Sequence, residues 1–329
     1  MPNSTDLLSV PSSQRNITVR PVAYGDLAEM AELFAGAFAD ETPDRQLRRR
    51  VQMVRCLYWA WKPLAFLSRR FRNLFNVYVG RLDGKLMGFV QLSHPSQATA
   101  HLDYIAVSSP YRRQGWGAKL LAAVLQQAVD PLHHSMLLET AFGNEAVRLY
   151  EIAGFQKMLS IAVCEKKASA PRPGTGCEFA YSIRPVRRGD EQQIRTLHKE
   201  VLPAEARTVI PWESGLCPGQ LQLWLDWLKN RLMGQSRKRY VIQQGGSVIA
   251  HFTLYLYPRT LNQHVSFTLA PACEKLRHCL MARALAMLPL WPEAVITTAC
   301  YSNTDKEMVL SELGFTVKER YWLMHRPGS

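Results

Sequence analysis

The chain has 329 residues, about twice a common domain length of roughly 150, so two domains or one duplicated unit are expected. Apolar residues make up 47% and charged residues 20%, which supplies packed cores and excludes collagen, coiled coil and global disorder. The net charge of +13 favours anionic partners such as phosphates, nucleic acid or an acidic membrane surface, without choosing among them.

Residues 1–16 are polar and contain Pro and Ser without an apolar core, so they predict a flexible N-terminus rather than a signal peptide. The longest apolar stretch, residues 56–67, is interrupted by Lys62 and Pro63 and is too short to span a bilayer. The seven cysteines are scattered and form no CxxC pair, which argues against a disulfide framework and a zinc site. We therefore expect a cytoplasmic protein with reduced thiols, no membrane span and no metal.

The predicted elements occur twice in the same order. The strand sequence Ile-Thr-Val-Arg-Pro-Val at Ile17 returns as Tyr-Ser-Ile-Arg-Pro-Val at Tyr181, and each is followed by Gly-Asp and an amphipathic helical run. In both copies a strand, turn and strand pattern typical of a hairpin follows, and a Gly-Phe pair occurs near the end of each copy. The offset between matching landmarks drifts only from 166 to 160 residues, which indicates two copies of one fold.

Each copy reads as strand, one or two helices, hairpin, strand, long helix, strand, helix and last strand, a mixed α/β pattern with a central sheet. In the first copy we expect strands at 100–107 and 135–140 and helices at 114–128 and 145–153. The predicted domains are 17–168 and 180–326. A Pro- and Gly-rich linker at 169–179 joins them.

The sharpest local signal follows the strand that ends at Val107, where a loop runs into a helix with two glycines at its start. Such a turn leaves successive backbone N–H groups to converge on an anion, and the helix dipole favours negative charge there. Side chains at Gly115 or Gly117 would obstruct this approach, and Arg112 and Arg113 add positive charge. The segment lacks the defining residues of a P-loop and of a dinucleotide-binding loop.

The pattern Arg112-x-x-Gly115-x-Gly117 resembles the coenzyme A signature of the GNAT acetyltransferase superfamily. The likeness continues through Asn144 and Tyr150 to Gly154-Phe155, and it covers most of residues 17–165. The spacing from the Asn to the Tyr is one residue shorter than is usual in that family. The resemblance implies an α/β fold of two tandem GNAT-like acyl-CoA N-acyltransferase domains.

The resemblance also implies a mechanism. Backbone N–H groups around Gln114 to Ala118 would hold the pyrophosphate of acetyl-CoA, and the strand end at 105–107 would orient the pantetheine arm and polarise the thioester. An amine would attack the carbonyl directly, and Tyr150 would protonate the departing thiolate. Glu139 stands where some protein N-terminal acetyltransferases of the family place their base. The implied cofactor-binding residues are Ile105, Ala106, Val107, Arg112, Arg113, Gln114, Gly115, Trp116, Gly117, Ala118 and Asn144.

Structural alternatives stand beside these roles. The two glycines could simply permit tight packing, Tyr150 could be a core aromatic residue, and Asn144 could cap the next helix. Glu139 could lie on a polar rim or relay a water. The pair His133-His134 predicts a solvated turn rather than a metal site. The basic and aromatic run at 48–72 predicts a wall of the acceptor site, with a membrane or nucleic-acid contact as the alternative.

The second copy carries different residues at the corresponding positions. Glu274, Arg277 and Cys279 stand where the first copy has Arg112, Gly115 and Gly117. Leu310 stands in place of the tyrosine. The second copy is therefore predicted to fold without catalysis, as in mycothiol synthase and other tandem GNAT proteins.

We therefore predict an N-acetyltransferase that moves acetyl from acetyl-CoA to a primary amine of a small molecule or protein. The alternative is a non-catalytic acyl-CoA-binding or regulatory module. Nucleic-acid binding through the excess charge lacks a recognised module and is not expected. The sequence leaves the acceptor and the oligomeric state open.

Overall fold

A computed structural model describes residues 17–37, 76–94, 99–128, 135–168, 181–210, 234–301 and 304–328. The chain divides into two compact units. One comprises Met1–His94 and Ala100–His133, and the other comprises Pro95–Thr99 and His134–Ser329. Four predicted features lie outside the described residues: the N-terminus, the basic and aromatic run at 48–72, the pair His133-His134 and the linker at 169–179.

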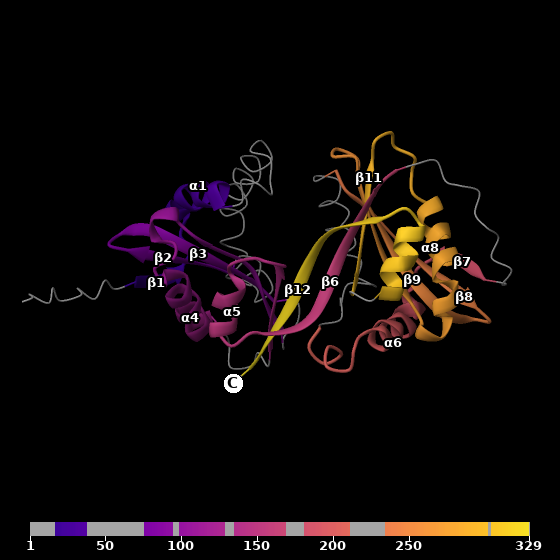
Figure 1. Cartoon of the computed structure of the whole chain (residues 1–329), viewed down its shortest axis with the longest axis horizontal. Coiled ribbons are helices and arrows are strands. Elements are labelled where there is room, and N and C mark those ends of the chain that lie inside the picture. Colours follow the sequence, from indigo (N-terminus) through magenta and orange to yellow (C-terminus); the bar gives the residue numbers. More distant parts are fainter. Residues whose placement is uncertain are drawn as a thin grey trace, which may run out of the picture. The chain divides into compact units, whose positions relative to one another are not determined.

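The first unit is built on strands that lie in chain order, each antiparallel to the next. They are β1 (Ile17–Pro21), β2 (Asn76–Leu82), β3 (Lys85–Ser93) and β4 (Thr99–Val107). Helix α1 (Leu27–Ala37) follows β1, and helix α4 (Trp116–Ala128) follows β4 (Figure 1). The predicted hairpin is confirmed, because Asp83 and Gly84 both take positive φ between β2 and β3.

The two helices of this unit pack on opposite faces of its sheet. Partly buried side chains of α1 pack against Val79, Phe89 and Ala106. On the other face Gly80 pairs with Gly88. A Cβ atom on Gly88 would lie only 2.6 Å from the Ala106 carbonyl oxygen and 3.0 Å from Leu120 of α4. The missing side chains therefore let α4 approach the sheet closely.

The repeated Arg-Pro-Val and Gly-Asp signals have one structural explanation. Arg20 donates two hydrogen bonds to Asp26, at 2.6 and 2.8 Å, and the Ala23 main-chain N–H donates a third. In the second copy Arg184 forms the same two-bond pair with Asp190. In each copy a buried carboxylate thus fixes the first strand to the start of the first helix, which explains why both residues recur.

Asp26→Asn is expected to lower the free energy of unfolding by about 2 kcal/mol, because hydrogen bonds to charged groups are lost at a buried site. Burial raises the pKa of Asp26, but bonds from Arg20, the Ala23 N–H and Arg81 outweigh burial, and the pKa falls below 3.8. Since the folded-state pKa is the lower one, this contribution is complete above about pH 4 and disappears as pH falls through that pKa.

Urea unfolding at pH 7 and at acidic pH measures the effect. Glu29→Gln is the control, because Glu29 is 48% exposed and contacts the same Arg81. It is expected to cost less than about 1 kcal/mol. Equal losses in the two variants would contradict the prediction.

The second unit contains the remaining strands of both copies in one sheet, in the order β5-β12-β6-β11-β10-β9-β8-β7. The strands are β5 (Ser135–Ala141), β6 (Gln156–Lys167), β7 (Ser182–Pro185), β8 (Ser236–Gln244), β9 (Ser247–Tyr257), β10 (Asn262–Leu269), β11 (Val295–Tyr301) and β12 (Thr316–Pro327). The helices are α5 (Val147–Ile152), α6 (Glu191–Val201), α8 (Arg277–Ala286) and α9 (Thr304–Glu312).

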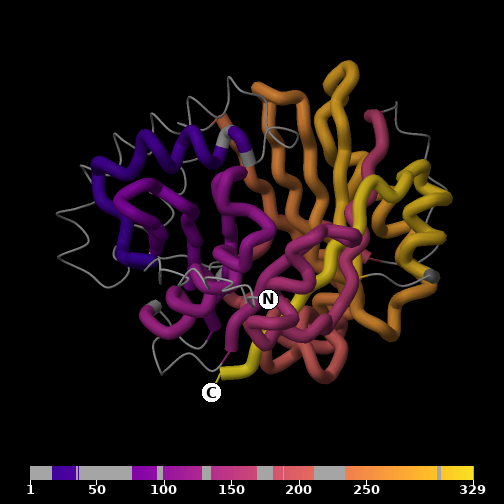
Figure 2. The backbone as a smooth tube through the Cα atoms, turned by 60° about the vertical axis from the view of Figure 1, so that its left-hand side comes forward, coloured from indigo at the N-terminus to yellow at the C-terminus, as the bar shows by residue number. Residues whose placement is uncertain are grey.

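The two copies exchange their last strands. Strand β12 of the second copy lies between β5 and β6 of the first, with Met324 opposite Leu138. Strand β6 in turn lies between β12 and β11, with Cys164 opposite Thr298. The C-terminal strand thus runs beside a strand from the middle of the chain (Figure 2). The two copies therefore depend on each other for their sheet, while the predicted domain limits at 168 and 180 stay predictions.

The core of the second unit lies between this sheet and the helices α8 and α9. Phe252 and Leu254 of β9 pack there with Leu280 of α8 and Leu310 of α9. Helix α6 covers the opposite face, where its Ile194 packs on Val241. The predicted order of elements is therefore confirmed in both copies.

Three sequence predictions need correction. The helix expected from 114 begins at Trp116, because Arg113 and Gly115 take φ of +59° and +80°, which a right-handed helix excludes. The helix expected at 145–153 covers only Val147–Ile152. Cys279 is disulfide-bonded, although Cys164, Cys273 and Cys300 are free thiols. The cysteine spacing could not reveal this bond, because the fold and not the sequence separation decides which thiols meet.

Candidate functional site

The loop between β4 and α4 lies in the first unit and has a defined shape. A short 3-10 turn at Ser109–Tyr111 follows the strand, and residues 112–115 then form the turn into α4. Gly115 is in the left-handed region at φ +80°, and a Cβ atom there would meet nothing described within 4 Å. The tight-packing alternative therefore fails at Gly115, where the backbone conformation is what favours glycine.

This turn leaves a row of main-chain donors without partners. The Gly115 carbonyl accepts the first helical hydrogen bond, from Lys119 N at 3.2 Å. Among the described residues, none accepts a hydrogen bond from the N–H groups of residues 114–118. Gly115 has no side chain to cap them. Five consecutive N–H groups at the positive end of a helix dipole match the needs of a diphosphate.

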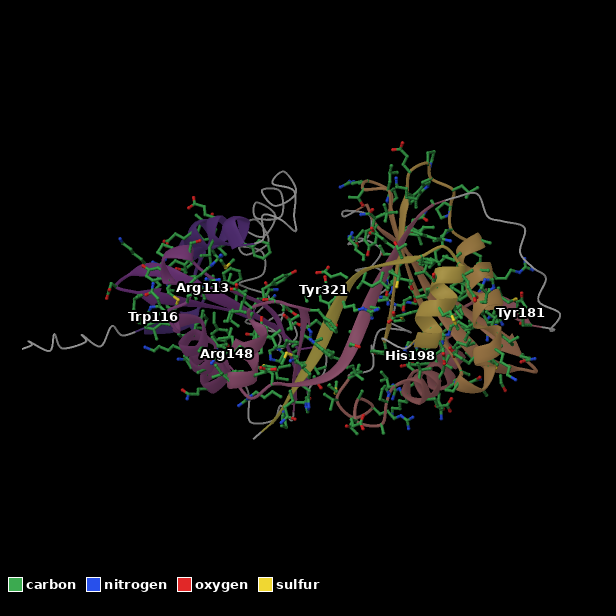
Figure 3. All side chains as sticks on the ribbon, in the orientation of Figure 1. Arg113, Trp116, Arg148, Tyr181, His198 and Tyr321 are labelled. Carbon is green, nitrogen blue, oxygen red and sulfur yellow. The ribbon has the colours of Figure 1, made fainter. Side chains whose placement is uncertain are left out.

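Side chains of the loop hold its shape. Arg112 donates from Nε to the Val107 carbonyl at 2.9 Å, and Gln114 donates from Nε2 to the Pro110 carbonyl at 2.8 Å. Trp116 is buried at the start of α4, while Arg113 is exposed (Figure 3). Ile105 and Val107 are half-buried at the end of β4, and Ala106 belongs to the core. The residues predicted for the cofactor are thus continuous from β4 into the first turn of α4.

A polar cluster that the sequence interpretation missed lies on β4 itself. Asp103 Oδ1 accepts a hydrogen bond from Ser93 Oγ at 2.8 Å and lies 2.8 Å from His101 Nδ1. A carboxylate only accepts, so the imidazole proton is on Nδ1 and Nε2 is the basic nitrogen. The sequence shows the His-x-Asp pair, but β4 has a register shift at Asp103, so regular strand alternation alone does not predict this contact.

Two further predicted residues lie in the second unit, along β5 and the turn after it. Glu139 is exposed, and no described cation pairs with it. Asn144 Oδ1 accepts a hydrogen bond from the Ala146 N–H at 2.8 Å. Its side chain therefore organises the turn before α5 but does not cap that helix, whose N-cap residue is Ala146.

Tyr150 is buried on α5, with its ring edge-on to Phe155 at a centroid distance of 6.2 Å. Its hydroxyl hydrogen-bonds to no described residue. Burial raises the pKa of Tyr150 to about 12, so the phenol keeps its proton throughout the physiological range. The ring therefore packs as a core aromatic, and the hydroxyl is available as a proton donor.

The corresponding loop of the second copy is occupied by an internal ion pair. Arg277 is buried at the first position of α8 and forms two hydrogen bonds with the Glu274 carboxylate. Leu310, the counterpart of the tyrosine, is buried in the core. The residue at the position of Arg112 is thus a carboxylate, and it is paired with the side chain at the position of Gly115.

Metal binding and membrane insertion are the next two features to consider. In the described part of the chain, no cluster of three or more His, Cys, Asp or Glu side chains has a metal-binding arrangement. No helix in the same residues is long and apolar enough to cross a membrane. The cytoplasmic location stays a prediction.

Comparison with known proteins places these features in a family. Residues 30–155 match the acetyltransferase (GNAT) family model. No curated protein matches. A GCN5-related N-acetyltransferase from Sphaerobacter thermophilus is 14% identical, with a TM-score of 0.58 over 95% of this chain and 97% of that one. A tandem GNAT protein of the clavulanic acid pathway is 13% identical, with a TM-score of 0.55 over 95% and 99%. An Anabaena variabilis N-acetyltransferase has a TM-score of 0.57 at 13% identity, over 95% and 73%.

The GNAT family match over residues 30–155 indicates an acyltransferase that uses an acyl-CoA donor. Residues 30–155, within the first copy, carry the GNAT family match, and the chain as a whole has the fold of tandem GNAT proteins. The family supports acyl-CoA-dependent N-acyl transfer. The loop residues fit such a donor, since they present a diphosphate-sized run of unpartnered donors.

Proposed function

We propose that the protein transfers acetyl from acetyl-CoA to a primary amine by direct attack, using its first copy. The observation that carries this proposal is the run of unpartnered N–H groups at residues 114–118. These donors would hold the diphosphate of acetyl-CoA, with Arg113 adding positive charge. The end of β4 at 105–107 would orient the pantetheine arm and donate a main-chain N–H to the thioester oxygen.

Tyr150 is the proposed proton donor to the departing thiolate. Its phenol is protonated at neutral pH, and its hydroxyl forms no hydrogen bond with a described residue. A general acid of this kind contributes roughly a hundredfold to ten-thousandfold to the rate. Asn144 would keep the turn before α5 in place rather than act on the reaction itself.

His101 is the proposed acceptor of the proton from the attacking amine. It lies on the same strand as residues 105–107, the proposed thioester contact, and its Nδ1 is hydrogen-bonded to Asp103. Asp103 fixes the tautomer and orients the ring, so it is a positioning residue. Glu139 stays the alternative base, on the family resemblance.

His101→Ala is expected to lower kcat/KM by about a hundredfold, the lower end of the range for proton-transfer catalysis, without changing the Kd for acetyl-CoA. Asp103→Asn is expected to have a smaller effect, since it removes only the orienting charge. Glu139→Gln is the competing variant, measured with the same amine across pH 6 to 9. A large loss in Glu139→Gln with a normal His101→Ala would assign the base to Glu139 instead.

Release of free CoA thiol from acetyl-CoA, in the presence of a panel of amines, tests the function itself. Transfer is expected for at least one primary amine, with the N-acetyl product seen by mass spectrometry. Tight binding of acetyl-CoA without transfer to any amine would favour the alternative, a non-catalytic acyl-CoA-binding or regulatory module.

The second copy is proposed to support the fold without binding a donor. The Glu274–Arg277 pair fills its loop, and Leu310 offers no proton. A bound diphosphate there would face the Glu274 carboxylate, which is partly exposed and paired with the buried Arg277. One acetyl-CoA per chain is the expected stoichiometry.

A further inference from the structure

The strand exchange brings residues of the second copy beside Glu139 of the first. Glu139 on β5 is directly opposite Leu323 on β12. Two residues along β12, Tyr321 is opposite Ala141 on β5 and Ile161 on β6. Directly paired residues share a sheet face, so Tyr321 is a diagonal neighbour of Glu139, within the reach of an aromatic side chain.

The same face continues to a second tyrosine. Ile161 of β6 is opposite Tyr301 of β11, so one row across four strands holds Ala141, Tyr321, Ile161 and Tyr301. The next row toward Glu139 contains Leu323 and Leu159. Burial raises the pKa of Tyr301 to about 12, and the nearby charge of Glu139 adds to the rise, which places the phenol and the carboxylate within electrostatic range of each other.

This face of the sheet combines a carboxylate with phenol rings and aliphatic side chains. Glu139 is an exposed carboxylate that no described cation neutralises, in a chain with a net charge of +13. In the part of the chain that the structure describes, nothing hydrogen-bonds to the Tyr301 hydroxyl. The floor between the tyrosines consists of half-buried aliphatic side chains, Leu159 and Ile161. A carboxylate, two phenol rings and an aliphatic floor match an ammonium group carried on an apolar or aromatic arm.

We infer that Tyr301 and Tyr321 of the second copy, together with Glu139 of the first, form the binding face for the acceptor, a primary amine on an apolar or aromatic arm. This inference rests on the proposed function, since it names the acceptor class of the same reaction. It gives the second copy a direct part in specificity. Polyhydroxylated amines would leave their hydroxyl groups against an aliphatic floor without partners, so they are disfavoured.

Two measurements on the full chain test this face. The first is calorimetric binding of 2-phenylethylamine to protein saturated with CoA. Tyr321→Ala and Glu139→Gln are each expected to weaken binding about fivefold to tenfold, and Tyr301→Phe about threefold. The second is acetyl transfer, with kcat/KM for 2-phenylethylamine expected at least about tenfold above that for glucosamine.

Tyr181→Phe is the matched control. Tyr181 also belongs to the second copy, it precedes β7 at the other end of this sheet from β5, and its hydroxyl meets Arg283 (Figure 3). It is expected to change neither measurement. Thermal unfolding of each variant separates a folding defect from a binding defect, and Tyr301→Phe keeps the ring in place.

The outcomes separate this inference from the proposed function. Amine binding that depends on Glu139 and Tyr321, without acetyl transfer, would support the face and refute the reaction. Transfer with normal amine KM in the Tyr301 and Tyr321 variants would overturn the face and leave the reaction intact. Absence of amine binding in the wild-type chain, or equal transfer to glucosamine, would also overturn it.

Discussion

Gly115→Glu is expected to weaken acetyl-CoA binding by about a hundredfold or more. The new carboxylate would stand among the unpartnered N–H groups, and φ of +80° strains any side chain there. A hydrogen bond to a charged group is worth about 1.5 to 3 kcal/mol, so losing one or two of them suffices for that factor. Calorimetry with acetyl-CoA and with CoA measures the change.

Gly84→Glu is the control for strain and charge. Gly84 also has positive φ, at +78°, and open space around its Cβ position, but it lies in the hairpin between β2 and β3. It is expected to bind acetyl-CoA normally, after any loss of stability is accounted for. Unchanged binding in Gly115→Glu would refute the site.

Tyr150→Phe is expected to reduce kcat by about a hundredfold to ten-thousandfold while the Kd for acetyl-CoA stays the same. Phenylalanine preserves the ring that packs on Phe155, so only the proton donor is lost. This substitution therefore separates the two roles assigned to the residue. Single-turnover kinetics with a fixed amine measures the step, and near-normal turnover would make Tyr150 a core residue only.

The pH dependence gives an independent check on the same residue. Since burial raises the pKa of Tyr150 to about 12, the phenol stays protonated below roughly pH 11. The rate of the wild-type chain is therefore expected to rise as the amine and the base lose their protons. It should show no fall from tyrosine ionisation between pH 8 and 10. A falling limb in this range that disappears in Tyr150→Phe would contradict the raised pKa.

Sequence reasoning reached the loop at α4 because the loop is made of consecutive residues. The glycine at positive φ, the neighbouring arginines and the helix start all depend on residues adjacent in the sequence. The sequence alone could therefore predict the turn around Gly115. The repeated Arg and Asp signals were likewise local, and they become an ion pair in each copy. The sequence prediction placed the helix start two residues early. Arg113 takes a positive φ although it is not a glycine, so nothing in the sequence indicates this conformation.

The amino-acid sequence alone determined the duplication, the order of elements and the loop at α4, since each depends on neighbours along the chain. Tertiary structure decided the rest: the His101–Asp103–Ser93 cluster, the ion pair that fills the second copy's loop, and the exchange of β6 and β12. The physical reason is that strand pairing joins residues far apart in sequence, and many pairings bury similar apolar faces. Only the assembled sheet therefore brings Tyr321 beside Glu139.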